Sequence, residues 1–346
     1  MKPTKIKTIL IGLGRIASKL ELDPYRKKPC THMGVLSSPW GKAHFEFLLG
    51  LDSKPVACQS FETQWKRKTK SIPDGSLRFL DGTSIDLAII ATPSHTHEFY
   101  AKQCMQMGIK QILIEKPVAM SVSGAKTLES LRKKKNAKIW INHERRYHPS
   151  YFYVKNELKK GNLGHLKSIR ASVFTSAKNP GIAFSKFGGG PLLHDGTHAV
   201  DLIHWLVEKP KLIQAKIERP KKNSVETRAF AYFQTKSKVE IILDVSGGRD
   251  YFQFELDIHT DSQRIICSND GFQFYRSVPS KLYQGFRSLE TYRPKDFPKP
   301  ESSNAFLGIY KEIKEVFHGE TTRMEASLAD NIQILESIES IYRQSK

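Results

Sequence analysis

The sequence predicts an α/β protein of two domains: a doubly wound parallel sheet, then an α+β domain with an open, mostly antiparallel sheet. At 346 residues the chain exceeds the roughly 250 to 300 at which a single core stops growing. The first part alternates wholly apolar runs with helical stretches, whereas the later part alternates apolar and polar residues. We place the domains at 1–147 and 148–346 and leave open whether the last helix packs back on the first.

The first domain contains six strand candidates separated by helical spacing. Runs such as LAIIA are apolar on both faces, which is typical of parallel strands covered by helices. Residues 94–108 and 122–135 have helical spacing, so this part is built of βαβ units with right-handed crossovers. The strand candidates are residues 7–14, 44–52, 76–81, 85–93, 110–117 and 137–144.

The second domain has a different pattern. Residues 251–259 alternate apolar and polar side chains, as a half-buried antiparallel strand does. Hairpins are predicted to turn at 235–238 and 269–271, and residues 293–304 form the clearest loop. Two amphipathic helices close the chain; their apolar residues are Phe306, Tyr310, Ile313 and Phe317, then Leu328, Ile332, Leu335, Ile338 and Tyr342.

Composition narrows the class of protein. No run approaches the roughly 20 apolar residues of a membrane span, and four scattered cysteines argue against a disulfide framework or zinc knuckle. We therefore expect a soluble, cytoplasmic protein without membrane contact. The net charge of +20 would attract a polyanion. The basic clusters at 65–70 and 131–138 lack interleaved aromatics, so we interpret them as solvated helix faces and disfavour a nucleic-acid partner.

A glycine motif follows the first strand. Gly12, Gly14 and Ala17 form GxGxxA between a strand and a helix. Such a motif allows a tight turn, close approach of a pyrophosphate to the backbone and tight packing of helix on strand. It predicts a Rossmann domain in which Gly12, Gly14, Arg15 and Ile16 bind the cofactor.

Asp52 ends the second strand candidate, where this fingerprint places an acidic residue for the adenosine ribose. It stands 40 residues beyond Gly12, where about 20 is usual. We assign the excess to loop-like segments at 21–30 and 37–45. The acidic side chain favours NAD, although Ser53 and Lys54 could hold a 2'-phosphate, so NADP remains possible. Asp52 could instead only cap the strand end.

Two further motifs lie at the predicted carboxyl ends of the fourth and fifth strands. They are ATPSHTH at 91–97 and IEKPVAM at 114–120. Ligands bind at these ends in an open parallel sheet. We therefore expect five residues to border the nicotinamide half of the cofactor: Thr92, Pro93, His97, Glu115 and Lys116.

With these motifs in order, the chain resembles the glucose-fructose oxidoreductase, inositol dehydrogenase and MocA (Gfo/Idh/MocA) family. The resemblance rests on GxGRIA, Thr92-Pro93 with His97, Glu115-Lys116-Pro117, NHERRYHP at 142–149 and GGGPLLHDGTHAVDLIHWL at 188–206. It implies an NAD(P)-dependent enzyme acting on CH–OH groups of a sugar, polyol or sugar nucleotide. It also implies a substrate domain whose open sheet often mediates homodimer or homotetramer contacts.

The resemblance implies roles for two residues. Lys116 would touch the reacting hydroxyl and the nicotinamide region, and His198 would serve as acid or base. Chemistry agrees, because loss of hydride from a carbinol requires a base with a pKa near neutrality, and histidine side chains ordinarily titrate near 6.5. A lysine would need its pKa lowered, or would act as a cation that stabilises alkoxide charge. We assign His198 as proton acceptor and Lys116 as electrostatic clamp, with exchanged or shared roles open.

The segment around His194 has competing interpretations. His194, His198 and Asp201 would share one face of a continuous helix, as a metal site would require. Gly196 weakens that helix, and no glutamate stands where a metallohydrolase base should, so we predict no metal.

This segment also departs from the family pattern. Many relatives carry aspartate four residues before the histidine, where this chain has His194, with Asp195 displaced by one. His194 therefore either supplies acid–base function, contacts a substrate phosphate as a cation or is a packed polar residue. Asp195 either contacts substrate or only orients His194. Arg146 either binds substrate or ties the domains together.

The sequence thus predicts a nicotinamide-dependent oxidoreductase acting on a carbohydrate-like substrate. The basic charge favours an anionic one. The alternative is a catalytically reduced, NAD-binding redox sensor or scaffold with a basic, polyanion-binding surface.

Overall fold

The computed structural model describes residues 4–175, 184–185, 187–221, 224–299 and 304–345. The chain forms two compact units. The first unit is Met1–Tyr147 with Asn304–Ile332, and the second unit is His148–Ser303 with Gln333–Lys346.

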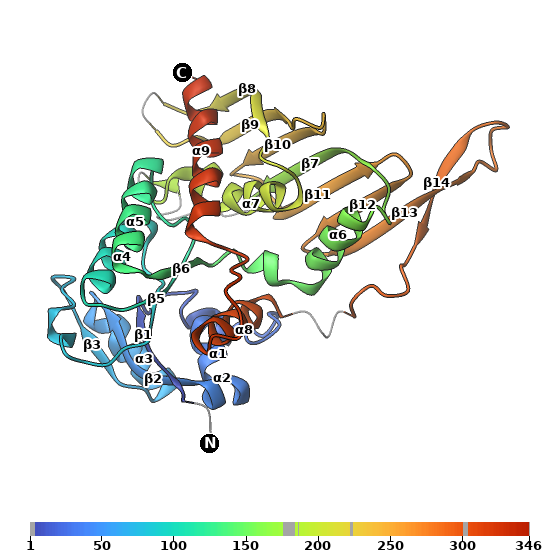
Figure 1. Ribbon diagram of the computed structural model, residues 1–346. Coiled ribbons are helices and arrows are strands. Elements are labelled where there is room, and N and C mark those ends of the chain that lie inside the picture. The colour runs from blue at the N-terminus through green and yellow to red at the C-terminus, as the bar shows by residue number, and fades with distance from the viewer. Residues whose placement is uncertain (1–3, 176–183, 186, 222–223, 300–303, 346) are drawn as a thin grey trace. The chain divides into compact units, whose positions relative to one another are not determined.

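The first unit contains a six-stranded, wholly parallel sheet in the order β3-β2-β1-β4-β5-β6 (Figure 1). The strands β4 and β5 are buried along their whole length, as their apolar sequences predicted. The doubly wound parallel sheet is therefore confirmed. Its strands are β1 Ile6–Ile11, β2 Phe45–Asp52, β3 Thr69–Ser71, β4 Leu87–Ile90, β5 Gln111–Ile114 and β6 Lys138–Ile141, and its main connecting helices are α3 Pro55–Trp65, α4 His97–Gln106 and α5 Val122–Lys135.

The strand predicted at 76–81 is wrong. This segment contains the short 3-10 helix η2 Arg78–Leu80, and β3 pairs with β2 in its place. Leu77 and Leu80 are both buried while Phe79 is partly exposed, so one turn of helix buries the apolar residues that a strand would have split between two faces. Short apolar runs do not distinguish these two outcomes.

The first crossover contains an insertion. The N–H groups of His32 and Met33 donate to the carbonyls of Ile16 and Ala17, at 3.3 and 2.9 Å. The chain therefore leaves the helical turn after Ala17, passes through η1 Lys19–Leu22 and an irregular stretch, and resumes at α1 His32–Ser37. The single helix expected after the glycine motif is interrupted, and the insertion accounts for part of the long spacing between Gly12 and Asp52.

The loop predicted at 37–45 is wrong. The structure has a short helix there, α2 Pro39–His44. The side chain of Ser38 caps it by accepting the N–H of Gly41 at 3.0 Å. Proline is tolerated in the first turn of a helix, where its missing N–H would have no partner anyway, so Pro39 begins this helix instead of breaking it.

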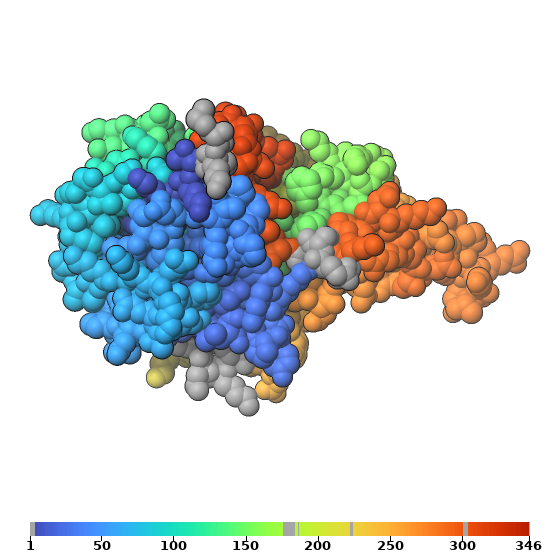
Figure 2. All heavy atoms as spheres, turned by 90° about the horizontal axis from the view of Figure 1, so that it is seen from below, coloured from blue at the N-terminus to red at the C-terminus, as the bar shows by residue number. Residues whose placement is uncertain are grey.

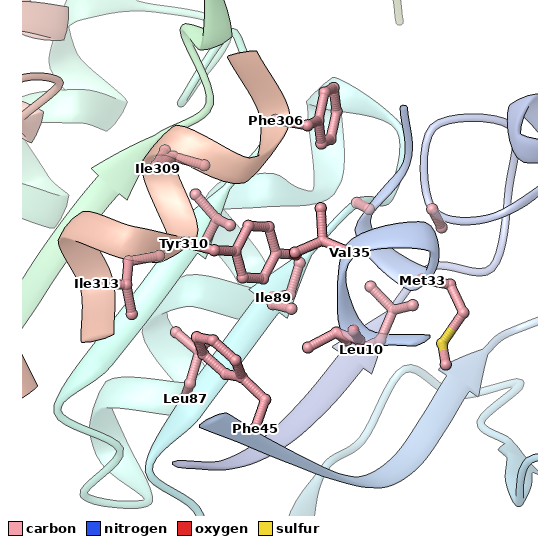
Figure 3. Close-up of a cluster of buried hydrophobic side chains, with 14 of the residues drawn as sticks. Leu10, Met33, Val35, Phe45, Leu87, Ile89, Phe306, Ile309, Tyr310 and Ile313 are labelled. Carbon is pink, nitrogen blue, oxygen red and sulfur yellow. The ribbon is translucent and has the colours of Figure 1, made fainter. Parts of the chain in front are cut away.

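Residues near the chain end complete the core of the first unit. The helix α8 Ala305–Phe317 turns Tyr310 toward side chains of β1, α1 and β2 (Figure 3). The ring of Tyr310 meets Phe45 edge-on at 5.5 Å between centroids. Burial of each such large side chain contributes roughly 1.5 to 3 kcal/mol. The final helix, α9 Leu328–Gln344, is divided between the two units.

The second unit contains an eight-stranded sheet in the order β14-β13-β12-β11-β7-β10-β9-β8. Every pair is antiparallel except β7 with β10, so the predicted open, mostly antiparallel sheet is confirmed. The hairpins β9–β10 and β12–β13 turn where predicted. The strands are β7 Leu166–Phe174, β8 Lys211–Glu218, β9 Arg228–Gln234, β10 Glu240–Ser246, β11 Gln253–Thr260, β12 Gln263–Ser268, β13 Gly271–Pro279 and β14 Arg287–Tyr292.

Helices cover one face of this sheet. The helices α6 Pro149–Lys160 and α7 Thr197–Leu206 lie against it, and the strands β13 and β14 extend beyond their neighbours as a narrow arm (Figures 1 and 2). In the loop predicted after this arm, residues 300–303 lie outside the described residues. Over the described part of the chain, every helix is too short or too polar to cross a membrane.

Candidate functional site

The two glycines of the turn after β1 have opposite surroundings. Gly12 has a φ of +89°, and a Cβ there would lie 2.6 Å from the carbonyl carbon and oxygen of Ala91. Its N–H donates to Leu51 at 2.7 Å. Around Gly14, a Cβ would meet nothing within 4 Å. The turn is therefore pressed against the end of β4 at Gly12 and open at Gly14.

Asp52 lies directly beside this turn, despite its distance in sequence. Its Oδ2 accepts the N–H of Leu13 at 2.9 Å, and its Oδ1 accepts the N–H of Lys54 at 2.9 Å. The carboxylate thus braces the glycine turn and the backbone at Lys54, directly before α3. Each carboxylate oxygen retains a second lone pair with which to accept a hydroxyl of a ligand.

His97 joins the turns that follow β4 and β5. It is buried, with Nδ1 at 2.7 Å from the carbonyl oxygen of Pro117 and Nε2 at 2.8 Å from that of Thr92. A neutral ring carries one N–H, so only the protonated ring could donate to both oxygens. Burial lowers the pKa of His97, and the two carbonyl oxygens oppose that shift.

Glu115 ends β5 and is 7% exposed. Its Oε1 accepts hydrogen bonds from Asn142 Nδ2 at 2.5 Å and from His32 Nε2 at 3.0 Å. Burial would raise the pKa of Glu115, but His32, Asn142 and the charge of Lys116 outweigh it and lower the pKa. Glu115 is thus held as a carboxylate, and Lys116 follows it at the carboxyl edge of the sheet.

The candidate cofactor residues therefore gather at one edge of the first unit, at the ends of β1, β2, β4 and β5. The order of the strands reverses between β1 and β4, which is the topological position where open α/β sheets bind ligands. Sequence reasoning missed His32 and Asn142, which hold Glu115. No local pattern indicated these contacts, because His32 lies 83 residues from Glu115 in sequence.

Arg146 is also buried in the first unit, at 4% exposure. Its Nη1 donates to the carbonyl of Glu325 and contacts Asp330 Oδ2 at 3.3 Å. Both partners belong to the same unit. These contacts fix the guanidinium in place, and its role toward substrate stays a prediction.

In the second unit, His194 and Asp195 lie within a π-helical turn, η6 Leu192–Gly196, that leads into α7 with His198. The Nδ1 of His194 is 2.9 Å from Asp195 Oδ1. The regular α-helical spacing assumed for the metal alternative is therefore absent, because a π turn inserts an extra residue. Across the described ranges, no three metal-ligating side chains cluster. Such turns are frequent at functional sites.

A buried carboxylate anchors the glycine-rich start of this helical segment. Glu226 is 1% exposed, and its Oε1 accepts the N–H of Leu192 at 2.8 Å and the hydroxyl of Tyr342 at 3.1 Å. A Cβ on Gly190, whose φ is +81°, would lie 2.6 Å from the Glu226 oxygens. Burial raises the pKa of Glu226, while these hydrogen bonds oppose the shift. Sequence reasoning missed Glu226 because nothing near it in sequence suggests a partner.

Comparison with known proteins connects both units to one group. Residues 6–143 match a family model described as the GFO/IDH/MocA oxidoreductase family, NAD-binding Rossmann fold. Residues 151–266 match the model of the GFO/IDH/MocA C-terminal domain. Together the two matches cover well over half of the chain.

Individual relatives are distant. The chain is 21% identical over 280 residues to the scyllo-inositol 2-dehydrogenase (NADP(+)) IolW of Bacillus subtilis, covering 76% of this chain and 77% of that enzyme. It is similar in structure to the WlbA dehydrogenase of Bordetella pertussis, solved with NADH and UDP-GlcNAcA, with a TM-score of 0.76, 19% identity and coverage of 99% and 97%. The aldose-aldose oxidoreductase of Caulobacter crescentus gives a TM-score of 0.78 at 17% identity, with coverage of 99% and 98%. At these identities the structural likeness shows the fold alone.

Proposed function

We propose, from the premise that this chain belongs to the GFO/IDH/MocA family of NAD(P)-dependent oxidoreductases, that it transfers a hydride between a nicotinamide and a hydroxyl-bearing carbon of a carbohydrate. The observation that carries the proposal is that Gly14, Asp52 and Lys116 lie at or just after the carboxyl ends of β1, β2 and β5 in one parallel sheet. Open space over Gly14 and a carboxylate beside the turn suit a dinucleotide.

Residues of the first unit would hold the cofactor. Gly12, Gly14, Arg15 and Ile16 would surround the pyrophosphate, and Asp52 the ribose. The turns at Thr92-Pro93 and Glu115-Lys116, joined by His97, would border the nicotinamide. When bound, the nicotinamide supplies the hydride acceptor or donor. NAD is the cofactor that Asp52 favours, and NADP remains compatible with Ser53 and Lys54.

The chain's own groups would handle the hydroxyl proton and the charge on oxygen. We assign His198 as the proton acceptor and Lys116 as the cation that stabilises developing alkoxide charge. His194 would share the acid–base work, and Asp195 and Arg146 would contact substrate. Hydrogen bonding of His194 to Asp195 supports an orienting role for that carboxylate.

The proposed substrate class is a sugar, polyol or sugar nucleotide. The relatives named above act on an inositol, act on aldoses or were solved with a sugar nucleotide. The net charge of +20 favours an anionic member of this class. We further propose a cytoplasmic homodimer or homotetramer.

Mass spectrometry of the purified protein tests this function directly. We expect it to release a nicotinamide dinucleotide on denaturation, and to oxidise or reduce at least one member of a panel of inositols, aldoses and UDP-sugars. Absorbance of the reduced nicotinamide at its characteristic band gives the rate. Tight NADH binding without turnover on the whole panel would instead support the sensor or scaffold alternative.

Replacement of Asp52 is expected to alter cofactor preference. In Asp52→Asn an amide oxygen can still accept the Leu13 N–H, but the charge that repels a 2'-phosphate is gone. We expect NADH to bind about tenfold more weakly, the loss of about one hydrogen bond to a charged group, while NADPH binds as well as before or better. Fluorescence titration with both cofactors measures this.

Asp52→Ala is the matched variant, because it removes the brace as well as the charge. It should weaken both cofactors, NADH more than NADPH. Equal weakening of the two cofactors in both variants would contradict a ribose contact.

His194→Asn tests the acid–base assignment. The amide nitrogen of asparagine can occupy the position of Nδ1 and keep the contact with Asp195, while the titrating ring is lost. We expect one limb of the curve of kcat against pH to move or disappear. A curve with the same shape as that of the wild type would assign His194 to packing.

A further inference from the structure

We propose that His32 is a positioning residue that holds the Glu115 carboxylate ionised and fixed beside Lys116. The proposal rests on the proposed function for its effect on turnover, but not for its structural part. Nothing in the sequence motifs drew attention to His32, which lies directly after the insertion in the first crossover.

The ring of His32 bridges two segments that are far apart in sequence. It is fully buried, with Nε2 at 3.0 Å from Glu115 Oε1 and Nδ1 at 2.8 Å from the hydroxyl of Tyr310. Phe306, on the same helix as Tyr310, packs edge-on against the ring at 5.4 Å. Helix α8 therefore supports the end of β5 through one side chain.

The donors and acceptors available fix the direction of the hydrogen bonds that run from Tyr310 through His32 to Glu115. A carboxylate only accepts, so Nε2 must carry a proton whether His32 is neutral or charged. In the neutral ring Nδ1 then accepts the proton of the Tyr310 hydroxyl, and every group is satisfied. Burial and the negative charge of Glu115 raise the pKa of Tyr310, so this hydroxyl keeps its proton.

This series of hydrogen bonds ends at Tyr310, inside the core of the first unit. Tyr310 and His32 are both fully buried, so neither side chain contacts solvent. Two hydrogen bonds, from His32 and Asn142, fix the Glu115 carboxylate, so orientation is the function that these contacts support. Tyr310 is itself packed among buried apolar side chains of the first unit (Figure 3), and its hydroxyl holds Nδ1 of His32 at 2.8 Å.

Charged and titratable groups on several elements interact electrostatically with Glu115, so their pKa values and that of Glu115 are linked. His32 and Lys116 lower the pKa of Glu115, and the charge of Glu115 in turn acts to raise the pKa of His97, Glu144 and Tyr310. These groups are His32 of α1, His97 of α4, Lys116 after β5, Glu144 after β6 and Tyr310 of α8. Of these groups, His32 donates a hydrogen bond to the carboxylate, from Nε2 to Oε1 at 3.0 Å.

Two isosteric substitutions separate the two contacts of His32. Glutamine can place its amide nitrogen near the position of Nε2, where it can still donate to Glu115, and asparagine can place its amide oxygen near that of Nδ1, where it can still accept from Tyr310. We expect His32→Gln to retain turnover within about threefold, and His32→Asn to lose about tenfold or more in kcat, the loss of a hydrogen bond to a charged group. NADH affinity should stay within about twofold in both, and the acid limb of kcat against pH should move to higher pH in His32→Asn.

Thermal unfolding gives a readout that needs no substrate. The pKa of Glu115 is lowered on folding, so its stabilisation is present above its ordinary value of 4.5 and is lost as pH falls through the folded value. The Tm of His32→Asn should therefore fall below that of His32→Gln near pH 8, and the gap should shrink toward pH 4. Tyr310→Phe, which leaves the Glu115 contact intact, should show the behaviour of His32→Gln.

These measurements keep the two proposals distinct. If the wild type turns over no substrate but the pH-dependent gap in Tm is present, the proposed function fails and the positioning by His32 stands. Equal losses in His32→Gln and His32→Asn, or a gap in Tm that does not change with pH, would overturn the positioning role. If both variants unfold, Tyr310→Phe with an unchanged acid limb supports the proposal, and a displaced limb contradicts it.

Discussion

Replacement of Lys116 by methionine is expected to lower kcat by at least about a hundredfold, which corresponds to about 2.7 kcal/mol of transition-state stabilisation. Methionine has a similar length but no charge, so it cannot stabilise an alkoxide. The adenosine and pyrophosphate contacts come from the turns after β1 and β2, so binding of NADH should persist. Initial rates and a fluorescence titration with NADH measure the two quantities separately.

Two matched variants sharpen this test. Lys133→Met removes a cation from the exposed end of α5, so it controls for the change in net charge and should leave kcat unaltered. Lys116→Arg keeps the charge, but arginine cannot accept a proton at ordinary pH. Partial recovery in Lys116→Arg supports the clamp, and a loss as deep as that of Lys116→Met would assign the proton to Lys116. Unchanged turnover in Lys116→Met would remove the residue from the mechanism.

Gly12→Ala is expected to destabilise the first unit and abolish cofactor binding. The new Cβ would lie 2.6 Å from backbone atoms of Ala91, and the φ of +89° is itself strained for alanine. Strain of this kind costs about 1 to 3 kcal/mol, and the overlap with rigid backbone adds to it. The Tm should fall by about 5 °C or more, as differential scanning calorimetry would record.

Gly14→Ala is the control for this prediction. No atom lies within 4 Å of the Cβ that it adds, so the Tm should match that of the wild type. The same methyl group would occupy the space that we assign to the pyrophosphate, so NADH affinity should fall. If Gly14→Ala bound NADH normally, the position of the pyrophosphate would be wrong. If Gly12→Ala kept its Tm, the close approach to β4 would be wrong.

Local features of the chain were enough to predict much of the fold. The apolar runs of β4 and β5 indicated strands buried on both faces, and the alternation of β11 indicated a sheet with one open face. The two wrong predictions of secondary structure also concerned short local segments. Residues 76–81 and 37–45 are short segments whose composition permits either helix or another structure, and packing decided between them.

The candidate site likewise contains residues that could be predicted from the sequence and contacts that could not. The glycine turn, Asp52 and the residues after β4 and β5 could be placed by sequence, because parallel strands deliver their carboxyl ends to one edge. The partners of buried polar groups could not. His32 meets Tyr310 across 278 residues, and Tyr342 meets Glu226 across 116.

Backbone geometry depends mainly on local sequence, through the positions of glycines and the period of apolar residues. The order of strands, turns and motifs could therefore be predicted from the sequence. Which buried polar side chains form hydrogen bonds with each other depends on packing, because partners that are distant in sequence come together only when the chain folds and excludes water around them. Lys116 could therefore be identified from its sequence motif. The hydrogen bond from His32 to Glu115, the residue before Lys116, forms only in the folded chain.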